Sequence, residues 1–449
     1  MRAAWRRWRK IAGWLGAIAA VAPMAAAAAT PPAKTPGWET VRADTFQLVW
    51  DTVNEAYYDP TFGGVDWAAI REKYRPRLVK AGDKAALREL LQQMLGELHR
   101  THFSILPREA AVFTPEERNR IGTVGLRLGY AEGKVVVAAV QPDSPAAGAG
   151  VVPGTVLLGA ADLDLVRIGA ALLAAHVPAP RCGLYLINWT NSRLHSPVGS
   201  KIALSLANPD GSARPLTLVS AEYPGVWSEP VGNFPSQPIE SEVRPLGEGV
   251  TYLRFNVFAR EAFRVAKQTL LTVPPNGGLV IDLRGNPGGV IVMASGLCGW
   301  LCGRECMLGT MHLRQGRLNF AVFPQPRAFL GPVAVLIDGG TASTSEILAA
   351  GLQELGRARV FGEPSAGAAL PAVFKTLPTG DLFQYAIADV LTPRGQLIEG
   401  HGVQPDQPVA RALGDIAAGR DPVLAAAVSW VNQQRTAPEG TPAPVAAKP

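Results

Sequence analysis

The stretch Val333-Ala-Val-Leu-Ile-Asp-Gly-Gly-Thr-Ala-Ser-Thr-Ser-Glu346 decides the fold of this chain. Its first five residues are uniformly apolar, which is typical of a strand that is buried on both faces. A turn of small residues follows, and a helix is predicted from Glu346 to Leu355. Ser343 therefore lies where a buried strand passes into a helix, and the converging amides there favour developing negative charge. Ser343-x-x-Glu346 is also a capping box, which needs no catalysis, so both interpretations remain open.

Strands and helices alternate around this stretch, which predicts a largely buried sheet flanked by helices. The further predictions are strands at 252–258, 279–283 and 358–361, a helix at 262–272 and a last helix that starts at 421–422. A second turn, Asp282-Leu-Arg-Gly-Asn-Pro-Gly-Gly289, follows one of these strands. Its two final glycines let backbone amides approach a ligand closely, as an oxyanion hole requires. Because the turn lacks the Lys-Ser/Thr ending of a phosphate-binding loop, nucleotide binding is disfavoured.

The hydrophobic period changes from helical to alternating near residue 122. Upstream, apolar residues at helical spacing predict three helices, the third of which has Asp83 as its N-cap and an apolar stripe from Leu87 to Leu98. Downstream, alternation predicts a small β module. Its predicted strands are 124–128, 135–140, 156–158, 184–187, 202–206 and 216–219.

A catalytic serine needs a base, and the chain has six histidines. His102 follows Leu98 by four residues, so we expect it to project from the core-facing stripe at the end of the third helix. A histidine on an apolar face is often structural, so this position by itself does not decide the role.

The two ends of the chain are predicted to lie outside the folded part. Residues 1–29 have a basic start, an apolar run and a small-residue end, the pattern of a secretory signal peptide, with a retained membrane anchor as the alternative. A Pro-rich linker is predicted at 30–43 and a disordered tail at 436–449. The first 29 residues hold five basic and no acidic residues, so the net charge of +6 falls to +1 without them, and nucleic-acid binding is not indicated.

The chain has four cysteines, of which Cys298, Cys302 and Cys306 recur every four residues. This spacing would place the three thiols on one helical face, which could suit a metal or redox site. No histidine is near them in sequence and no C-x-x-C occurs, so the sequence favours small buried helix residues over metal ligands. We expect neither a metal nor a cofactor.

The two turns, together with Glu399-Gly-His-Gly-Val-Gln-Pro-Asp406, resemble the C-terminal processing (tail-specific) serine peptidases. The resemblance extends from about residue 44 to residue 431. It implies an α+β multidomain chain with an N-terminal helical domain at 44–111, a PDZ-like β module at 112–222 and a crotonase-like α/β catalytic core at 223–435. It also implies that Val124, Gly125 and Leu126 lie in a loop that binds a peptide C-terminus by strand addition. A β module that has lost peptide binding is the alternative.

The chain departs from most of this family at one position. Those enzymes hold a lysine base in a glycine-lysine-glycine turn, which here reads Gly367-Ala368-Ala369. Lys375 does not replace it, because the family's next marker falls at Thr379-Gly380 without a gap.

The sequence instead resembles the tricorn-type branch, whose base is a histidine. Gly96-Glu-Leu-His-Arg-Thr-His102 matches that branch with His102 as the base and Thr101 as a helper hydroxyl, and Glu399 matches its carboxylate. With Ser343 as nucleophile, the resemblance implies that the N–H groups of Gly288 and Thr344 bind the oxyanion.

The favoured function is therefore an exported, periplasmic or secreted serine endopeptidase that cleaves polypeptides near their C-termini through an acyl-enzyme. The alternatives are an inactive homologue that binds peptides or partner proteins, and a member of the fold that binds a small ligand. The expected partner is a polypeptide substrate or a peptide C-terminus, without nucleic acid, and membrane contact is expected only if residues 1–29 are retained. The sequence does not indicate an oligomeric state.

Overall fold

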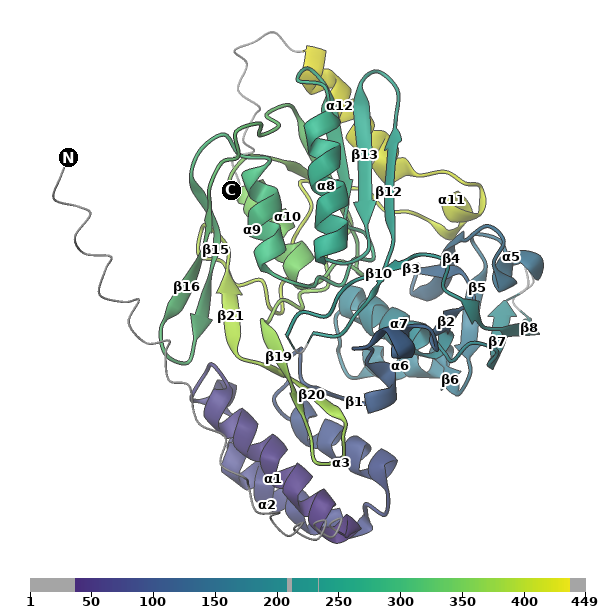
Figure 1. Cartoon of the computed structure of the whole chain (residues 1–449), viewed down its shortest axis with the longest axis vertical. Helices are drawn as coiled ribbons and strands as arrows, with labels where there is room; N and C mark the ends of the chain where they lie inside the picture. The colour runs from purple at the N-terminus through teal and green to yellow at the C-terminus, as the bar shows by residue number, and fades with distance from the viewer. Residues whose placement is uncertain (1–36, 208–211, 233, 437–449) are drawn as a thin grey trace, which may run out of the picture.

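The computed structural model describes residues 37–207, 212–232 and 234–436, which form a helical domain, a β module and a large α/β domain (Figure 1). The predicted signal peptide and nearly all of the predicted tail lie outside the described residues. Within the described part of the chain, no helix is long and apolar enough to cross a membrane.

The helical domain contains α1 (Trp38–Ala56), α2 (Trp67–Tyr74) and α3 (Lys84–Gly96). Its core is made by buried side chains of all three helices, and the Asp83 side chain caps α3 by accepting from the Ala86 N–H, as predicted. Residues 38–43, predicted as linker, are instead the first turns of α1. Trp38 explains the difference, because its indole N–H donates to Ala81 O at 2.9 Å and fixes the start of the helix.

The β module is an antiparallel sheet with two helices. The strands lie in the order β3 (Leu126–Ala131), β4 (Lys134–Val140), β5 (Val156–Ala160), β7 (Lys201–Ala207), β8 (Ala213–Val219), with β6 (Leu163–Asp164) beside β5. The helices are α6 (Leu165–Ala174) and α7 (Ala179–Leu194), and short elements complete the module: α4 (Pro115–Arg118), α5 (Pro145–Gly148), β2 (Gly122–Thr123) and β9 (Ala221–Glu222).

One predicted strand of this module is wrong. Residues 184–187 belong to α7, where Leu186, Thr190 and Leu194 are buried at helical spacing. A run of only four apolar residues cannot distinguish a strand from a buried turn of helix, and here the longer helical pattern determines the structure.

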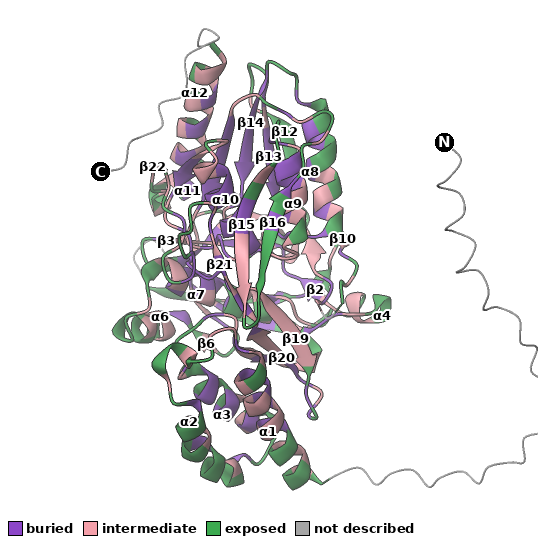
Figure 2. Cartoon of the chain, turned by 90° about the vertical axis from the view of Figure 1, so that its left-hand side faces the viewer, coloured by how far each residue is buried: buried purple, intermediate pink, exposed green. Residues whose placement is uncertain are grey.

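The large domain is built on a six-stranded sheet. Its order is β12 (Ser241–Pro245), β13 (Val250–Phe255), β14 (Gly278–Asp282), β17 (Val333–Ile337), β18 (Arg359–Gly362), β22 (Gln407–Pro408), and all neighbours are parallel except β12 and β13. One face packs against α8 (Arg260–Thr272), α9 (Val292–Gly299) and α10 (Thr344–Glu354), and the other against α12 (Pro422–Thr436). Figure 2 shows the buried strands between these helices, as the alternating pattern predicted.

A second sheet of the large domain contains β16 (Arg317–Val322), β15 (Cys306–Leu313) and β21 (Ala388–Leu391) in that order. The domain also contains β10 (Val226–Trp227), β11 (Pro238–Ile239) and α11 (Leu413–Ala417).

A third sheet joins the large domain to the helical domain. The hairpin β19 (Ala372–Thr376) and β20 (Leu382–Ala386) reaches toward the helices, and β1 (Ser104–Leu106) pairs antiparallel with β20 (Figure 1). Phe383 of this hairpin is fully buried in the core of the helical domain. The pairing therefore fixes the turn just before β1, at residues 97–103, against the large domain.

Candidate active site

Ser343 occupies a strained position at the junction of β17 and α10. Its backbone has φ 54° and ψ −122°, a conformation that costs energy for a residue with a side chain and occurs most often at functional sites. The side chain is partly exposed, although the residues on both sides of it are buried. Ser343 is thus held where a substrate can reach its hydroxyl.

Glu346 fixes the backbone around this serine. Its fully buried carboxylate accepts from the backbone N–H of Ser343 at 3.0 Å, of Gly367 at 2.7 Å and of Ala368 at 3.0 Å, and from the Ser365 hydroxyl. Burial raises the pKa of Glu346 to about 7, against the effect of these donors. The sequence showed Glu346 only as part of a capping box, whereas in the structure it also ties Ser343 to the turn at Gly367 and Ala368.

By sequence, Ala368 is the residue that aligns with the family's lysine. Its carbonyl accepts from the Ser343 N–H at 2.8 Å, and its methyl group packs with Ala342, Ala366 and Leu184 of α7. Lys375 is elsewhere: its Nζ donates to Thr52 Oγ1 on α1 at 3.0 Å. The contact agrees with the prediction that Lys375 does not replace the lysine.

His102 lies in a turn and not on a helix as predicted, because α3 ends at Gly96. Its backbone has φ 60°, and its Nδ1 is 2.8 Å from Thr101 Oγ1. Thr101 Oγ1 in turn donates to Glu399 Oε2 at 3.0 Å, so its lone pairs face the imidazole and Nδ1–H is the donor. The second ring nitrogen, Nε2, is then the basic one.

Glu399 joins the histidine turn to the turn at Ala368. Besides Thr101 Oγ1, its carboxylate accepts from the Thr101 N–H at 3.2 Å and from the Ala369 N–H at 3.0 Å. Ala369 follows Ala368, whose carbonyl binds Ser343. Ser343 and Glu399 therefore both contact the turn at Ala368 and Ala369, and His102 is linked to that turn through Thr101 and Glu399; the described contacts include no direct hydrogen bond between Ser343 and His102.

His102 is neutral at ordinary pH. Burial, reinforced by the positive charge of Arg181, lowers its pKa to about 4. Arg181 comes from α7, and its guanidinium donates to the carbonyls of Ala366 and Gly367. A neutral imidazole with an available nitrogen is the form that a general base requires.

The predicted oxyanion donors lie next to the serine. A Cβ at Gly288, which has φ 101°, would be 2.7 Å from Ser343 Cβ and 2.9 Å from the Thr344 N. The Gly288 N–H donates to Asn286 Oδ1 at 3.0 Å, whereas the Thr344 N–H has no acceptor among the described residues. An oxyanion would therefore find one free donor and would compete with Asn286 for the second.

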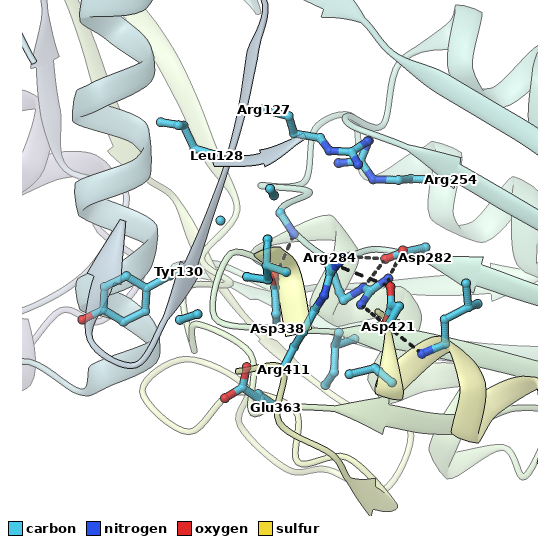
Figure 3. Close-up of a pocket in the computed structure, with 18 of the residues that line it drawn as sticks. Arg127, Leu128, Tyr130, Arg254, Asp282, Arg284, Asp338, Glu363, Arg411 and Asp421 are labelled. Carbon is cyan, nitrogen blue, oxygen red and sulfur yellow. Dashed lines mark hydrogen bonds and ion pairs between the residues drawn. The ribbon is translucent and has the colours of Figure 1, made fainter. Parts of the chain in front are cut away.

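A buried ion pair anchors the turn that carries Gly288. Arg284 donates to Asp282 and to Asp421 at the start of α12, in a charged cavity of about 180 Å³ (Figure 3). Although burial opposes it, Arg284 holds the pKa of Asp282 below its usual range. The Asp338 carboxylate then bridges this turn to the serine turn by accepting from the N–H groups of Gly285 and Gly340, both at 2.9 Å.

The residues predicted to bind a peptide C-terminus are only partly placed in a groove. Val124 is fully buried in the core of the β module, and the Gly125 N–H donates to Thr123 Oγ1 at 3.0 Å. Leu126 lines a cavity of about 370 Å³. Residues of β3, α7 and both catalytic turns line the same cavity, among them Leu128, Ile187, Asn191, Pro287 and Gly340.

Two family models match the chain. Residues 249–409 match the peptidase family S41, and residues 39–96 match the tricorn protease C1 domain. The first match covers the two turns and Glu399, and the second covers α1 to α3.

Individual relatives agree with these models. The carboxyl-terminal-processing protease of Picosynechococcus sp. is 27% identical over 377 residues, which covers 82% of this chain and 84% of the relative. A putative tricorn protease homolog 2 of Streptomyces coelicolor is 25% identical over 407 residues, 86% of this chain but 32% of the relative. The structure of a photosystem II D1 C-terminal processing protease shares the fold, with a TM-score of 0.57 and 24% identity over 82% of this chain and 93% of that one.

Proposed function

We propose that this chain, whose residues 249–409 match the peptidase family S41 and whose residues 39–96 match the tricorn protease C1 domain, is an exported serine endopeptidase that cleaves polypeptides near their C-termini. In this proposal Ser343 is the nucleophile, His102 its base and Glu399 the carboxylate behind the base. One observation carries it: the chain of contacts from Glu399 through Thr101 to His102 is fixed to the same turn that binds Ser343. This arrangement supplies a neutral base where the usual lysine is absent.

The reaction follows the ordinary course of acyl transfer. His102 Nε2 accepts the Ser343 hydroxyl proton while Oγ attacks the scissile carbonyl, and the Thr344 and Gly288 N–H groups bind the oxyanion. The imidazolium then gives the proton to the leaving amine. Water repeats the sequence on the acyl-enzyme and releases the serine. Thr101 accepts from Nδ1–H throughout, so Glu399 stabilises the imidazolium through the Thr101 hydroxyl and without direct contact.

Substrate capture is assigned to the PDZ-like module. β3 is an edge strand of its sheet, so it can accept an added peptide strand. The cavity beside it extends to Pro287 and Gly340, which belong to the two catalytic turns. A tail bound along β3 would therefore lead toward Ser343. Export rests on the signal-peptide pattern of residues 1–29.

Labelling by a fluorophosphonate, which reacts only with an activated serine, tests the proposal. We expect the intact protein to be labelled and to cleave unfolded polypeptides, and we expect Ser343→Ala and His102→Ala each to lower labelling by at least about 1,000-fold. Ser429→Ala and His176→Ala are matched controls, because both side chains are exposed, Ser429 on α12 and His176 between α6 and α7, away from these contacts.

Two outcomes would contradict parts of the proposal. Labelling that survives His102→Ala would eliminate His102 as the base. A folded protein that is neither labelled nor proteolytic but binds C-terminal peptides would instead support the inactive peptide-binding homologue.

A further inference from the structure

Three cysteine thiols converge at the end of α9, outside the proposed active site. The Sγ atoms of Cys298, Cys302 and Cys306 all lie within 4.8 Å of one another, and Cys298 and Cys302 are 3.5 Å apart. The sequence predicted three thiols along one helix, but only Cys298 lies in α9, and Cys306 is the first residue of β15. A tight turn at 303–305 therefore returns the chain so that the third thiol meets the other two.

The local backbone explains this convergence. The Cys302 N–H donates to Cys298 O at 2.9 Å, so the last helical turn places these two side chains on the same side. Cys306 is fixed separately, because it pairs with Val322 in the second sheet. Close packing does not require the end of a helix and the start of a strand to bring three thiols together. The prediction of small buried helix residues therefore does not explain why the three Sγ atoms meet.

From this geometry we propose that Cys298, Cys302 and Cys306 bind a thiophilic d¹⁰ metal ion, Zn²⁺ or Cu⁺, through three thiolates. Metal–sulfur bonds of about 2.3 Å place ligand sulfurs roughly 3.8 to 4.0 Å apart, within the span observed here. All three cysteines are free, and 3.5 Å is far from the ~2.05 Å of a disulfide. Among the described residues no histidine or carboxylate completes the cluster, so three thiolates bind Cu⁺ directly, or Zn²⁺ with one external ligand.

Charge and exposure around the cluster suit a bound metal. Three thiolates with either ion carry a net negative charge, and the cations Arg304 and Arg357 lie near enough to interact with Cys302. Arg357 also donates to the carbonyls of Leu301 and Phe329, which places its guanidinium beside the cysteine segment. Cys298 and Cys302 are buried, whereas Cys306 is partly exposed and gives the ion a route in.

The site is structural in this proposal and independent of the peptidase reaction. Arg357 follows the C-terminal end of α10, and Ser343 precedes its first residue, so the length of the helix, roughly 16 Å, separates the two sites. A bound ion would join α9 to β15, and both pack on α10. Metal loading should therefore raise thermal stability.

Metal titration of the full-length, reduced protein tests the proposal. After removal of metal with a chelator under anaerobic conditions, the protein is titrated with Zn²⁺ and with Cu⁺, each against a chromophoric competitor. We expect about one equivalent of one ion to bind, with sulfur-to-metal charge-transfer absorption and a higher melting temperature. The ion that is retained when both compete identifies the site as zinc or copper.

Cys306→Ser is the decisive variant, because this residue is only partly buried and its loss should leave the fold intact. We expect its affinity to fall at least about 100-fold, since even loss of an outer-shell partner costs 10- to 100-fold. Cys182→Ser is the matched control, because that buried thiol lies on α7 and bonds to Val177 O. Unchanged binding in Cys306→Ser, less than stoichiometric binding of both ions, or a Cys298–Cys302 disulfide that forms in preference to metal binding would each overturn the proposal.

Discussion

Ser343 lies at the end of the short turn that joins the buried strand β17 to α10, whereas His102 lies in an irregular turn between α3 and β1. A neighbour in sequence, Glu346, accepts from the Ser343 N–H, and the more distant Ala368 carbonyl accepts from the same group. The histidine depends on Glu399, which is 298 residues from Thr101 in the chain. The position of the proposed nucleophile thus depends largely on local structure, and that of the proposed base depends on domain packing.

The serine turn and the histidine turn should therefore respond differently to substitutions. Changes at the serine turn act directly on the reacting atoms, because that turn has little room to adjust. Changes at the histidine turn act through the position and proton of the imidazole, so they should lower the rate less. Three substitutions test this order, from the largest expected effect to the smallest.

Gly288→Ala tests how tightly the serine turn is packed. The added Cβ would lie 2.7 Å from Ser343 Cβ and 2.9 Å from the Thr344 N, so it would displace both the nucleophile and an oxyanion donor. We expect kcat/KM and the rate of fluorophosphonate labelling to fall about 100- to 1,000-fold, as when an oxyanion donor is lost.

Gly395→Ala is the control for the backbone cost. Gly395 has φ +80° with nothing within 4 Å of an added Cβ, so it shares the strain of a positive φ without the contacts. Both variants should lose about 1 kcal/mol of stability for that reason. Equal activities in the two variants would show that Gly288 does not lie against the reacting groups.

Thr101→Val tests the histidine turn. The substitution keeps the shape but removes the hydroxyl that accepts from His102 Nδ1–H and donates to Glu399. We expect kcat to fall about 10- to 100-fold with little change in KM, because the imidazole loses its orientation and the substrate groove is untouched.

Thr101→Ser tests whether the loss of rate comes from the missing hydroxyl or from changed packing of the side chain. This variant keeps Oγ and should recover most of the lost rate. A Val variant as fast as the intact protein would show that His102 does not depend on Glu399. Equal losses in the Ser and Val variants would instead mean that the methyl group of Thr101 is needed as much as its hydroxyl.

The same contrast explains what the sequence could predict. The Ser343 turn and the strands β13, β14, β17 and β18 of the six-stranded sheet follow from apolar runs and turn residues that are adjacent in sequence, and β17 was predicted with the bounds observed. The position of His102 was predicted on a helix, because periodicity does not show that α3 ends at Gly96. Two features depend on the direction of a turn, which no local sequence pattern specifies. They are the contacts of Glu346 and the convergence of Cys306 on Cys298. The Ser-x-x-Glu pattern was the one local indication of a role for Glu346, and it predicted only a helix cap.

Arg181→Gln should have the smallest effect. Arg181 lies on α7 of the β module and donates to the carbonyls of Ala366 and Gly367, so this variant tests how the β module affects the two turns. In the proposal His102 acts as a base when neutral, and its pKa of about 4 places the acid limb of kcat/KM that belongs to His102 below about pH 5, apart from any change near pH 7 where Glu346 takes up a proton. Burial is the main cause of this low value and Arg181 the second. Removing a nearby cation stabilises the imidazolium, so the pKa should rise and the acid limb should move upward by up to about one pH unit.

The pH dependence of labelling measures this shift, with Arg193→Gln as the control. Arg193 lies on the same helix, α7, but pairs with Asp162 at the surface, so its loss should leave the acid limb in place. If no limb below about pH 5 moves in Arg181→Gln, then His102 is not in the buried setting described. If Arg181→Gln alone moves the limb, then α7 of the β module sets the proton affinity of a base in the helical domain, and any substrate that displaces α7 also changes the pKa of His102.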